Sequence, residues 1–308
     1  MRHERRSHPP LGSSRAPRFP SVPDPVEHLR LSDSRHIPFL DLGDPSGFPV
    51  IYHHGWPSSA WQAGLAHNCA KELGIRIIAP DRSRFRPHRN PGSVSDVADD
   101  IIELIQELNI PECSHLGVSG GAPYALSTVS KAPDQTHRAI LCSGMVHPGP
   151  QCIRLLFRPY RILASIQRHS PRLLKWTLRF AFGCLRSTPE SGLMKLLLRV
   201  LSRPDRAALQ DPDTLATVER AIRQAIYPDS QGIIQDGIRL TTPWKFQAQI
   251  RQLPVWIAHG QLDHVIPVSV PVTAYPDVDP SRFRVYPEEG HYSLPIRHMK
   301  DLLQSLMH

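Results

Sequence analysis

The sequence lacks the features that mark several common structural classes. Its 308 residues contain no run of 18 or more apolar residues, so we expect no transmembrane helix. Its cysteines are odd in number and include no CxxC pair, which argues against a disulfide framework or a zinc site and favours a reducing compartment. The five are Cys69, Cys113, Cys142, Cys152 and Cys184. Together these absences predict a cytoplasmic protein.

An apolar leader segment is also missing. Residues 1–25 are rich in Arg, Ser and Pro and poor in aliphatic side chains, whereas a secretory signal needs an apolar segment. An organelle transit peptide would need an amphipathic apolar face, which is absent, and Glu4 does not suit one. We therefore expect residues 1–25 to form a disordered basic tail. The alternative is that the start codon has been placed too early in the gene.

Acidic residues are outnumbered, and the formal net charge is +8. Such a charge suits an acidic partner such as nucleic acid or a membrane surface. The basic residues gather in the N-terminal tail, in residues 82–89 and in residues 154–186, and no nucleic-acid-binding motif accompanies them. We therefore expect a solvated basic surface and no nucleic-acid partner.

Regular structure is predicted from about residue 27 onward. Short apolar or alternating segments indicate strands, and apolar residues at helical spacing indicate helices. Strands are expected at 26–33, 36–43, 49–55, 75–81, 113–119, 137–144, 254–260 and 283–290. Helices are expected at 60–73, 93–108, 122–131 and 294–307. Residues 146–240 carry only helical patterns.

The alternation of strands and helices predicts an α/β fold with a doubly wound, mostly parallel sheet, whose first two strands form an antiparallel edge. Residues 26–145 and 241–308 would form this core, and residues 146–240 would form an inserted helical cap. A cap at that place would cover the carboxyl ends of the strands, where open α/β sheets bind ligands. The 40% of apolar residues suffice for a core of this size.

One glycine-rich turn carries a candidate nucleophile. Residues 117–121 are Gly-Val-Ser-Gly-Gly between a predicted strand and a predicted helix, which is the G-x-S-x-G nucleophile elbow in its required context. Glycines two positions before and after Ser119 would make room for a strained serine backbone. A phosphate-binding turn is the alternative, but a dinucleotide fingerprint needs G-x-G-x-x-G early in the fold, and this motif comes later.

Two further residues follow Ser119 in the order Ser, Asp, His that such a hydrolase uses. Asp263 comes after the buried strand at 254–260, and His291 comes after the last strand. Because loops after parallel strands meet at one edge of the sheet, we expect the three side chains to lie close together. Asp263 could instead cap a helix, with His264 as the functional residue, and His291 could be one surface histidine among many.

These segments give the chain a resemblance to the α/β-hydrolase superfamily, in particular to soluble bacterial members with a helical cap. The resemblance rests on HHGWP at 53–57, APD at 79–81, GVSGGAPYAL at 117–126, HGQLDHVIP at 259–267 and EGHYSL at 289–294. It implies that Ser119 is the nucleophile, His291 the general base and acid, and Asp263 its orienting carboxylate. It implies no metal and no cofactor.

The resemblance also implies an oxyanion hole, which stabilises negative charge on a substrate oxygen. Its two donors would be the backbone N–H groups of Trp56, in the first loop, and of Gly120, directly after the nucleophile. The residues that would support the two loops are His54, Gly55, Gly117 and Gly121.

The chain departs from the family in the loop after Asp81, where Arg84 and Arg86 replace the usual glycines. With Arg82 they could favour an anionic substrate at the entrance to the site, and Trp244, at the exit from the cap, could lie there too. The default interpretation is that these arginines are solvated residues at the protein surface.

The predicted function is hydrolysis of a small carbonyl compound, namely a carboxylic ester, lactone or thioester, through an acyl-enzyme on Ser119. The alternatives are perhydrolase or haloperoxidase-like activity of the same triad, and a non-catalytic ligand-binding role on the same fold.

The basic amphipathic helices between 153 and 200 also suit a membrane surface. We expect their apolar faces to cover the active-site mouth instead, with no stable membrane insertion. The oligomeric state is left open.

Overall fold

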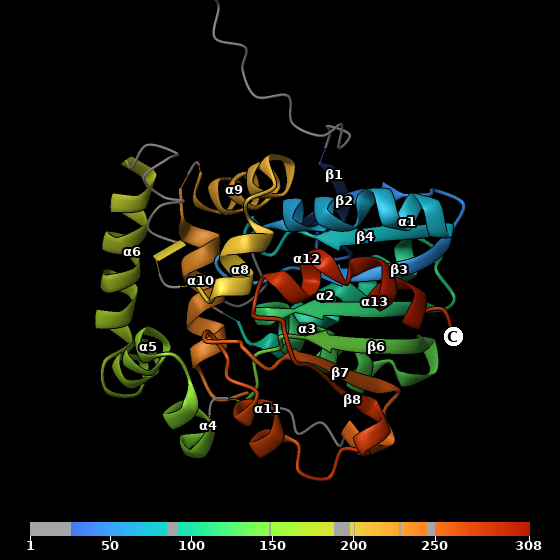
Figure 1. Cartoon of the computed structure of the whole chain (residues 1–308). Helices are drawn as coiled ribbons and strands as arrows, with labels where there is room; N and C mark the ends of the chain where they lie inside the picture. The colour runs from blue at the N-terminus through green and yellow to red at the C-terminus, as the bar shows by residue number, and fades with distance from the viewer. Residues whose placement is uncertain are drawn as a thin grey trace, which may run out of the picture.

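The fold is given by a computed structural model of the chain (Figure 1). The structure describes residues 26–84, 92–147, 149–187, 198–199, 201–227, 229–244 and 250–308. The predicted tail at residues 1–25 lies outside the described residues, as does most of the helical pattern near residues 192–202.

Eight strands of the described chain form one sheet in the order β1-β2-β4-β3-β5-β6-β7-β8. The pairs β1–β2 and β2–β4 are antiparallel, and all the other neighbours are parallel. The strands are β1 (Glu27–Arg30), β2 (His36–Gly43), β3 (Phe48–His53), β4 (Ile75–Pro80), β5 (Cys113–Val118), β6 (Thr136–Cys142), β7 (Val255–Gly260) and β8 (Phe283–Tyr286). The predicted fold class is therefore confirmed.

Alternating apolar side chains along the strands build a core on each side of the sheet. In β3, Val50 and Tyr52 belong to one core, and Ile51 between them belongs to the other. This is the two-residue period of a strand that is buried on both faces. Helices cover both faces, as Figure 1 shows. They are α1 (His67–Leu73) and α13 (Met299–Ser305) on one face, and α2 (Val94–Glu107) and α3 (Ala122–Lys131) on the other.

Two of the predicted helices are interrupted. Residues 60–73 form a 3-10 helix, η1 (Ala60–Ala66), followed by α1, and Gly64 within η1 weakens an α-helix. The C-terminal segment forms α12 (Ser293–Arg297) and then α13, because the backbone of His298 between them leaves the helical region at φ −109° and ψ 16°. The proline-rich segment at 267–280, before β8, forms the short α11 (Ser269–Ala274), and a 3-10 helix, η5 (Pro280–Arg282), follows.

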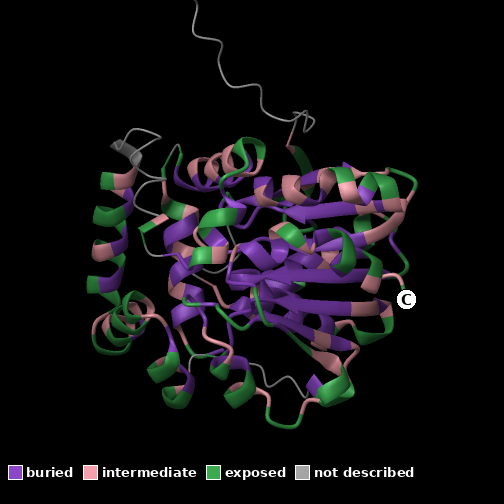
Figure 2. Cartoon of the chain, in the orientation of Figure 1, coloured by how far each residue is buried: buried purple, intermediate pink, exposed green. Residues whose placement is uncertain are grey.

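The described residues of 146–240, between β6 and β7, form a helical insertion without a strand. Its helices are α4 (Pro150–Leu155), α5 (Arg158–His169), α6 (Pro171–Ser187), α8 (Arg203–Ala208), α9 (Pro212–Ile226) and α10 (Gln231–Thr241). Figure 1 shows the insertion at the left, beyond one end of the strands, with α6 outermost. Figure 2 shows buried residues throughout the sheet and exposed residues along the outer sides of α5 and α6.

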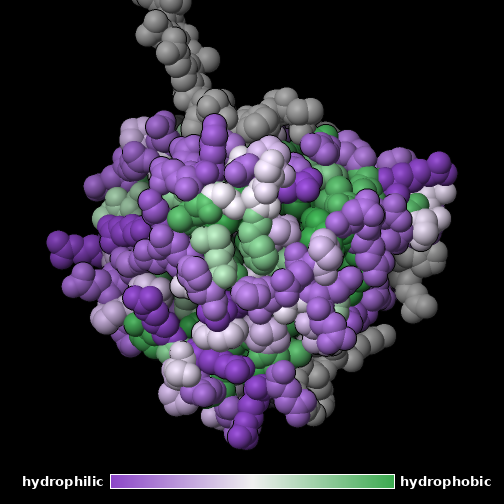
Figure 3. Space-filling view, turned by 90° about the vertical axis from the view of Figure 1, so that its right-hand side faces the viewer, coloured by the Kyte–Doolittle hydropathy of each residue, from purple (hydrophilic) through white to green (hydrophobic). Residues whose placement is uncertain are grey.

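The two ends of the molecule have different surfaces. The end away from the insertion is mainly hydrophilic, with hydrophobic side chains showing between the polar ones (Figure 3). The insertion instead exposes Leu173, Trp176 and Phe180 of α6. In the part of the chain that is described, no helix combines the length and the apolar character needed to cross a bilayer.

Candidate active site

Ser119 lies on the turn between β5 and α3, and the geometry of this turn depends on glycine. The Ser119 backbone has φ +52°, in the left-handed region that is costly for a residue with a side chain. A Cβ at Gly121 would overlap the carbonyl oxygen of His53, and a Cβ at Gly117 would lie 2.8 Å from the Cα of Ala122. Glycine at both positions therefore lets α3 start close against the sheet behind the serine.

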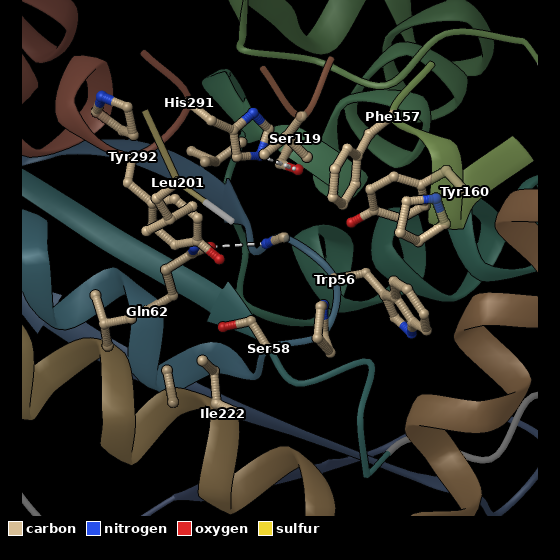
Figure 4. A pocket seen from close by; sticks show the side chains of 18 of the residues that line it. Trp56, Ser58, Gln62, Ser119, Phe157, Tyr160, Leu201, Ile222, His291 and Tyr292 are labelled. Atoms are coloured by element: carbon tan, nitrogen blue, oxygen red, sulfur yellow. Dashed lines mark hydrogen bonds between the residues drawn. The ribbon is translucent and has the colours of Figure 1, made fainter. Parts of the chain in front are cut away.

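The structure brings Ser119, His291 and Asp263 together from three separate loops. The His291 imidazole faces the Ser119 hydroxyl (Figure 4). Its Nε2 lies 2.9 Å from Ser119 Oγ, and its Nδ1 lies 2.8 Å from Asp263 Oδ2. Ser119 and His291 expose only 7% and 6% of their surfaces, and Asp263 is buried. The three side chains thus form one continuous hydrogen-bonded series.

Asp263 is held by its own loop and acts on the basicity of His291. Its Oδ1 accepts the backbone N–H groups of Val265 and Ile266, each at 2.8 Å. Burial alone would lower the pKa of His291. The charge of Asp263, its hydrogen bond and the charge of Asp205 outweigh burial and raise that pKa above its ordinary value. The ring is therefore a stronger base toward the Ser119 hydroxyl than a free imidazole.

The loop after β3 brings the backbones of Trp56 and Gly120 side by side. A Cβ at Gly120 would lie 3.0 Å from the Trp56 backbone nitrogen. Within the described residues, neither backbone N–H makes a turn or loop hydrogen bond, whereas the Gly55 N–H donates to Gln62 Oε1 at 2.7 Å. The backbone N–H groups of Trp56 and Gly120 therefore lie close together next to Ser119, and their role as an oxyanion hole stays a prediction.

His54 is fully buried beside this loop and bonded through both ring nitrogens. Its Nδ1 lies 2.9 Å from the Gly55 carbonyl oxygen, and its Nε2 accepts the Arg82 backbone N–H at 3.1 Å. Burial and the nearby Arg82 charge hold the pKa of His54 well below its ordinary value, so the ring is neutral and donates from Nδ1. Its contacts are those of a loop support.

Arg82, which we expected at the entrance, lies elsewhere. Its guanidinium is buried, donates to the His54 carbonyl oxygen, lies over the ring of Tyr124 and is 3.5 Å from Asp236 Oδ2. These partners neutralise and hold the charge away from the cavity wall. The hypothesis that Arg82 selects an anionic substrate is therefore wrong.

Two other residues predicted for the entrance, Arg84 and Trp244, line neither of the cavities that adjoin Ser119. Arg84 contacts Gln224 and lies 3.8 Å from Asp81. Trp244 is buried and packs edge-on against His147. Arg86 lies outside the described residues.

A cavity of about 300 Å³ opens beside Ser119 and His291 (Figure 4). Among the described residues that line it, none is Asp, Glu, Lys or Arg. The apolar wall comes from the core loops and from the insertion, where α5 contributes Tyr160 and α9 contributes Ile222. Gln62 is one of its few polar side chains. The cavity therefore suits an uncharged, largely apolar ligand.

A second and smaller cavity, of about 20 Å³, also adjoins Ser119. It shares Trp56 and Tyr160 with the larger one, and adds Gly120 and Leu240. His291 lines only the larger cavity. The two spaces beside the serine thus differ in size and in access to the imidazole.

Sequence patterns did not reveal how α10 contacts the Trp56 loop. Trp56 Nε1 donates to the backbone carbonyl oxygen of Ile233 at 2.8 Å. A Cβ at Gly237 would lie 2.8 Å from the indole, so glycine there allows the close approach. The insertion therefore helps to hold the loop that carries one of the expected oxyanion donors.

Asp205, on α8, is a second contact that was not predicted. Its Oδ1 accepts the backbone N–H groups of Tyr292 and Ser293, each at 2.8 Å, and its Oδ2 accepts that of His291 at 3.2 Å and the Ser202 hydroxyl at 2.7 Å. The Ser202-x-x-Asp205 spacing is an ordinary helix-capping pattern. That pattern carries no sign of a partner loop 86 residues later.

The described part of the chain contains no group of three or more His, Cys, Asp or Glu side chains that could hold a metal ion. Among the described side chains that line the two cavities, His291 is the only imidazole, and none is a carboxylate or a cysteine. That the protein needs no cofactor stays a prediction.

Comparisons with known proteins give one consistent family. The model of the alpha/beta hydrolase family matches residues 50–304. A non-heme chloroperoxidase from Streptomyces lividans is 32% identical over 37% of this chain and 43% of that protein. A non-heme haloperoxidase from Rhodococcus erythropolis is 24% identical over 84% of this chain and 90% of that protein. The structure of a thermophilic esterase from Thermogutta terrifontis has a TM-score of 0.63 at 18% identity, covering 92% of this chain and 97% of that one.

These similarities differ in what they establish. The chain spans less than half the length of the Streptomyces relative that it matches, and the likeness to the Thermogutta structure, at 18% identity, shows the fold alone. The family model covers most of the chain, from β3 to α13, and includes Ser119, Asp263 and His291. The chain therefore belongs to the alpha/beta hydrolase family.

Proposed function

We propose that the protein is a serine hydrolase acting on an uncharged carbonyl compound, namely a carboxylic ester, a lactone or a thioester. The observation that carries this proposal is the hydrogen-bonded series from Ser119 through His291 to Asp263 at the wall of an apolar cavity. Each member has the partner that its role requires: a nucleophile next to a base, and a base oriented by a carboxylate.

The first half of the proposed reaction forms an acyl-enzyme. His291 Nε2 takes the Ser119 proton while Oγ attacks the carbonyl carbon, and Asp263 stabilises the resulting imidazolium. The backbone N–H groups of Trp56 and Gly120 donate to the carbonyl oxygen as it becomes negative. The proton on His291 then passes to the leaving group as its bond to carbon breaks, and the acyl group remains on Ser119.

The second half releases the acid. A water molecule gives a proton to His291 Nε2 while its oxygen attacks the acyl carbon, and the same backbone donors stabilise the second oxyanion. When the bond from carbon to Ser119 Oγ breaks, the serine regains a proton from His291 and the carboxylic acid leaves. No step needs a group other than substrate and water.

The two cavities divide the substrate between them. The leaving group must lie within reach of His291, which lines only the larger cavity. The acyl group must then enter the cavity of about 20 Å³ beside Gly120, where there is room for only a few atoms. We therefore propose short-chain acyl esters of larger, apolar and uncharged alcohols as the preferred substrates.

Labelling with a fluorophosphonate tests the proposed chemistry. The wild-type chain should label on one residue, found by mass spectrometry to be Ser119, and Ser119→Ala should abolish the labelling. Ser143→Ala is a matched control, because Ser143 is another buried serine with positive φ that follows a strand, at φ +46°. A wild-type chain that does not label would instead indicate a binding protein on a hydrolase fold.

Two matched esters test the proposed division of the substrate. Benzyl acetate places the large group on the alcohol side, and methyl phenylacetate, which has the same atoms, places it on the acyl side. We expect kcat/KM to favour benzyl acetate by at least about tenfold, a difference of about 1.4 kcal/mol in transition-state binding. The reverse preference would contradict the assignment of the acyl group to the smaller cavity and of the alcohol to the larger one. It would leave the proposed role of Ser119 unaffected.

Perhydrolysis is the second candidate function, and the similarity to non-heme peroxidases favours it. In that reaction hydrogen peroxide replaces water as the attacking molecule on the acyl-enzyme and releases a peracid. We expect a detectable rate of peracetic acid formation from acetate esters and peroxide that disappears in Ser119→Ala. A rate equal to that of Ser119→Ala would remove this candidate.

A further inference from the structure

The outer surface of α5 and α6 is strongly positive. The sequence has no Asp or Glu between Asp134 and Glu190, a stretch that contains both helices. The exposed basic side chains are Arg158, Arg161, Arg168, Arg172, Lys175 and Arg179. Because acidic side chains are missing from both helices, the positive charge there is not balanced locally.

Large apolar side chains lie within this positive surface. Leu173, Trp176 and Phe180 recur at spacings of three and four residues and therefore share one side of α6. They are 54%, 73% and 77% exposed. The opposite side of the helix, with Leu174 and Phe182, is buried. The buried stripe of α6 is explained by packing over the site, but the exposed stripe is not. The expectation from sequence that packing over the site explains all the apolar residues of these helices is therefore corrected.

We propose that the basic and apolar face formed by α5 and α6 docks on the surface of an anionic lipid bilayer. Aromatic side chains next to Arg and Lys are characteristic of helices that lie in the bilayer interface. The rings enter the boundary between headgroups and acyl chains, and the cations attract anionic headgroups. A second copy of the chain fits less well, because it would bring two positive surfaces together.

The position of α5 connects this face with the site. Arg161 and Ile162 are exposed on one side of the helix, while Tyr160 and Leu163 line the larger cavity. A docked protein would therefore hold the cavity wall about one helix diameter, roughly 10 Å, from the lipid. An apolar substrate dissolved in the bilayer would be concentrated beside the site.

Vesicle binding tests the proposal directly. The full chain is sedimented with vesicles of phosphatidylcholine alone and with vesicles that contain phosphatidylserine. We expect co-sedimentation only with the anionic vesicles, and we expect it to fade as salt is added. Trp176 is far more exposed than Trp61 or Trp244, so its fluorescence should shift to the blue on binding, and Trp176→Phe should remove most of that shift.

Variants of α6 separate this face from other positive surfaces, including the N-terminal residues. Each basic residue near an anionic surface strengthens binding by about fivefold, so the triple variant Arg172→Glu, Lys175→Glu, Arg179→Glu should bind at least about 100-fold more weakly. The matched control reverses three exposed arginines outside the insertion, namely Arg30→Glu, Arg251→Glu and Arg284→Glu. The control should keep most of the binding.

Three results would overturn the proposal. The first is no binding to anionic vesicles at low salt, and the second is equal weakening by the α6 variant and its control. The third is a stable dimer, seen by analytical ultracentrifugation, that Trp176→Ser with Phe180→Ser converts to monomer, because the apolar stripe would then cover a second copy. Binding that only the α6 variant loses would support docking whether or not the protein is a hydrolase.

A second inference, which rests on the proposed function, concerns Asp205. We infer that Asp205 is a positioning residue for His291, supplied by the insertion. Its buried carboxylate accepts the N–H groups of three successive residues, beginning with His291 itself, and so fixes the backbone from which the imidazole projects. A displacement of a catalytic group by about 1 Å can cost about 100-fold in rate.

The variant Asp205→Asn tests this role through two readouts. We expect kcat to fall by about 100-fold while the chain still folds, because the amide cannot accept all three N–H groups. Among the described residues, Asp263 would then be the remaining carboxylate that raises the pKa of His291. His259, which also lies near Asp263, stays neutral because burial lowers its pKa. The pKa of His291, followed by NMR, should therefore fall, and the acidic limb of the rate profile should move to lower pH.

Controls make the outcome decisive. Asp213→Asn removes the same charge from an exposed position on α9 and should change neither readout. If Asp205→Asn does not fold, Asp205→Glu keeps the charge and moves the carboxylate, and should lower kcat without lowering the His291 pKa. Unchanged kcat and pKa in a folded Asp205→Asn would overturn the inference. A wild-type chain without turnover dependent on Ser119 would instead refute the proposed function, and this role of Asp205 with it.

Discussion

The core and the helical insertion contribute to the candidate site in different ways. In the core, Ser119, Asp263 and His291 lie on loops directly after strands, and each is within hydrogen-bond distance of the next. The insertion supplies most of the apolar wall, and its polar contacts with the site loops include those made by Asp205 and by the Ile233 carbonyl oxygen. The core thus carries the three side chains of the series at one sheet edge, whereas the insertion lines the cavity and also contacts the loops of His291 and Trp56.

The largest expected effect lies in the core. Asp263→Asn should lower kcat by about 10⁴-fold with little change in structure, because the amide no longer stabilises the protonated imidazole or its correct tautomer. Steady-state kinetics on an acetate ester measure the change. Asp277→Asn, at an exposed position after α11, should leave kcat unchanged. A loss below about tenfold for Asp263→Asn would mean that another carboxylate orients His291.

Two glycine substitutions compare the packing of the two regions. Gly121→Ala should lower the free energy of unfolding by about 3 kcal/mol, because the new Cβ would overlap the His53 carbonyl oxygen in a region without room to relax. The new Cβ in Gly183→Ala, on α6, would meet no heavy atom of the described residues within 4 Å apart from the backbone of its own helix. It should raise stability by about 0.5–1 kcal/mol through helix propensity. Urea unfolding measures both. Equal effects would show that the core is not the more tightly constrained region.

The pH dependence should reflect the electrostatics of the core. Because the pKa of His291 lies above its ordinary value of 6.5, the ring protonates, and the base is lost, already at mildly acidic pH. We expect kcat/KM to fall about tenfold for each pH unit below that pKa. A profile that stays flat below pH 6 would contradict the claim that the charges of Asp263 and Asp205 outweigh burial at His291.

The smallest expected effect comes from the contact between the two regions. Gly237→Ala places a Cβ 2.8 Å from the Trp56 indole and should shift the loop that carries one oxyanion donor. We expect kcat/KM to fall by about tenfold with a change in stability below about 1 kcal/mol. Circular dichroism and thermal unfolding serve as the check on stability. Unchanged kinetics would mean that α10 does not position this loop.

The difference between the core and the insertion also explains which site residues could be predicted from the sequence. Ser119, Asp263 and His291 each follow a strand, and each lies in a local motif. The period of the apolar residues predicted the strands, and the motifs predicted which loops meet at the shared sheet edge. Asp205 has only a local capping pattern, and its partners depend on how the insertion packs. The prediction for Arg82 failed for the same reason, because its partners Tyr124 and Asp236 are distant in sequence.

The most direct test of the proposed mechanism is the capture of its covalent intermediate. The protein is mixed with an acetate ester, quenched in acid within milliseconds, digested and examined by mass spectrometry. The mechanism predicts that the peptide containing Ser119 gains one acetyl group, and that the gain disappears in Ser119→Ala. Turnover that proceeds with the acetyl group absent from Ser119, or attached to another residue, would contradict acyl transfer at this serine.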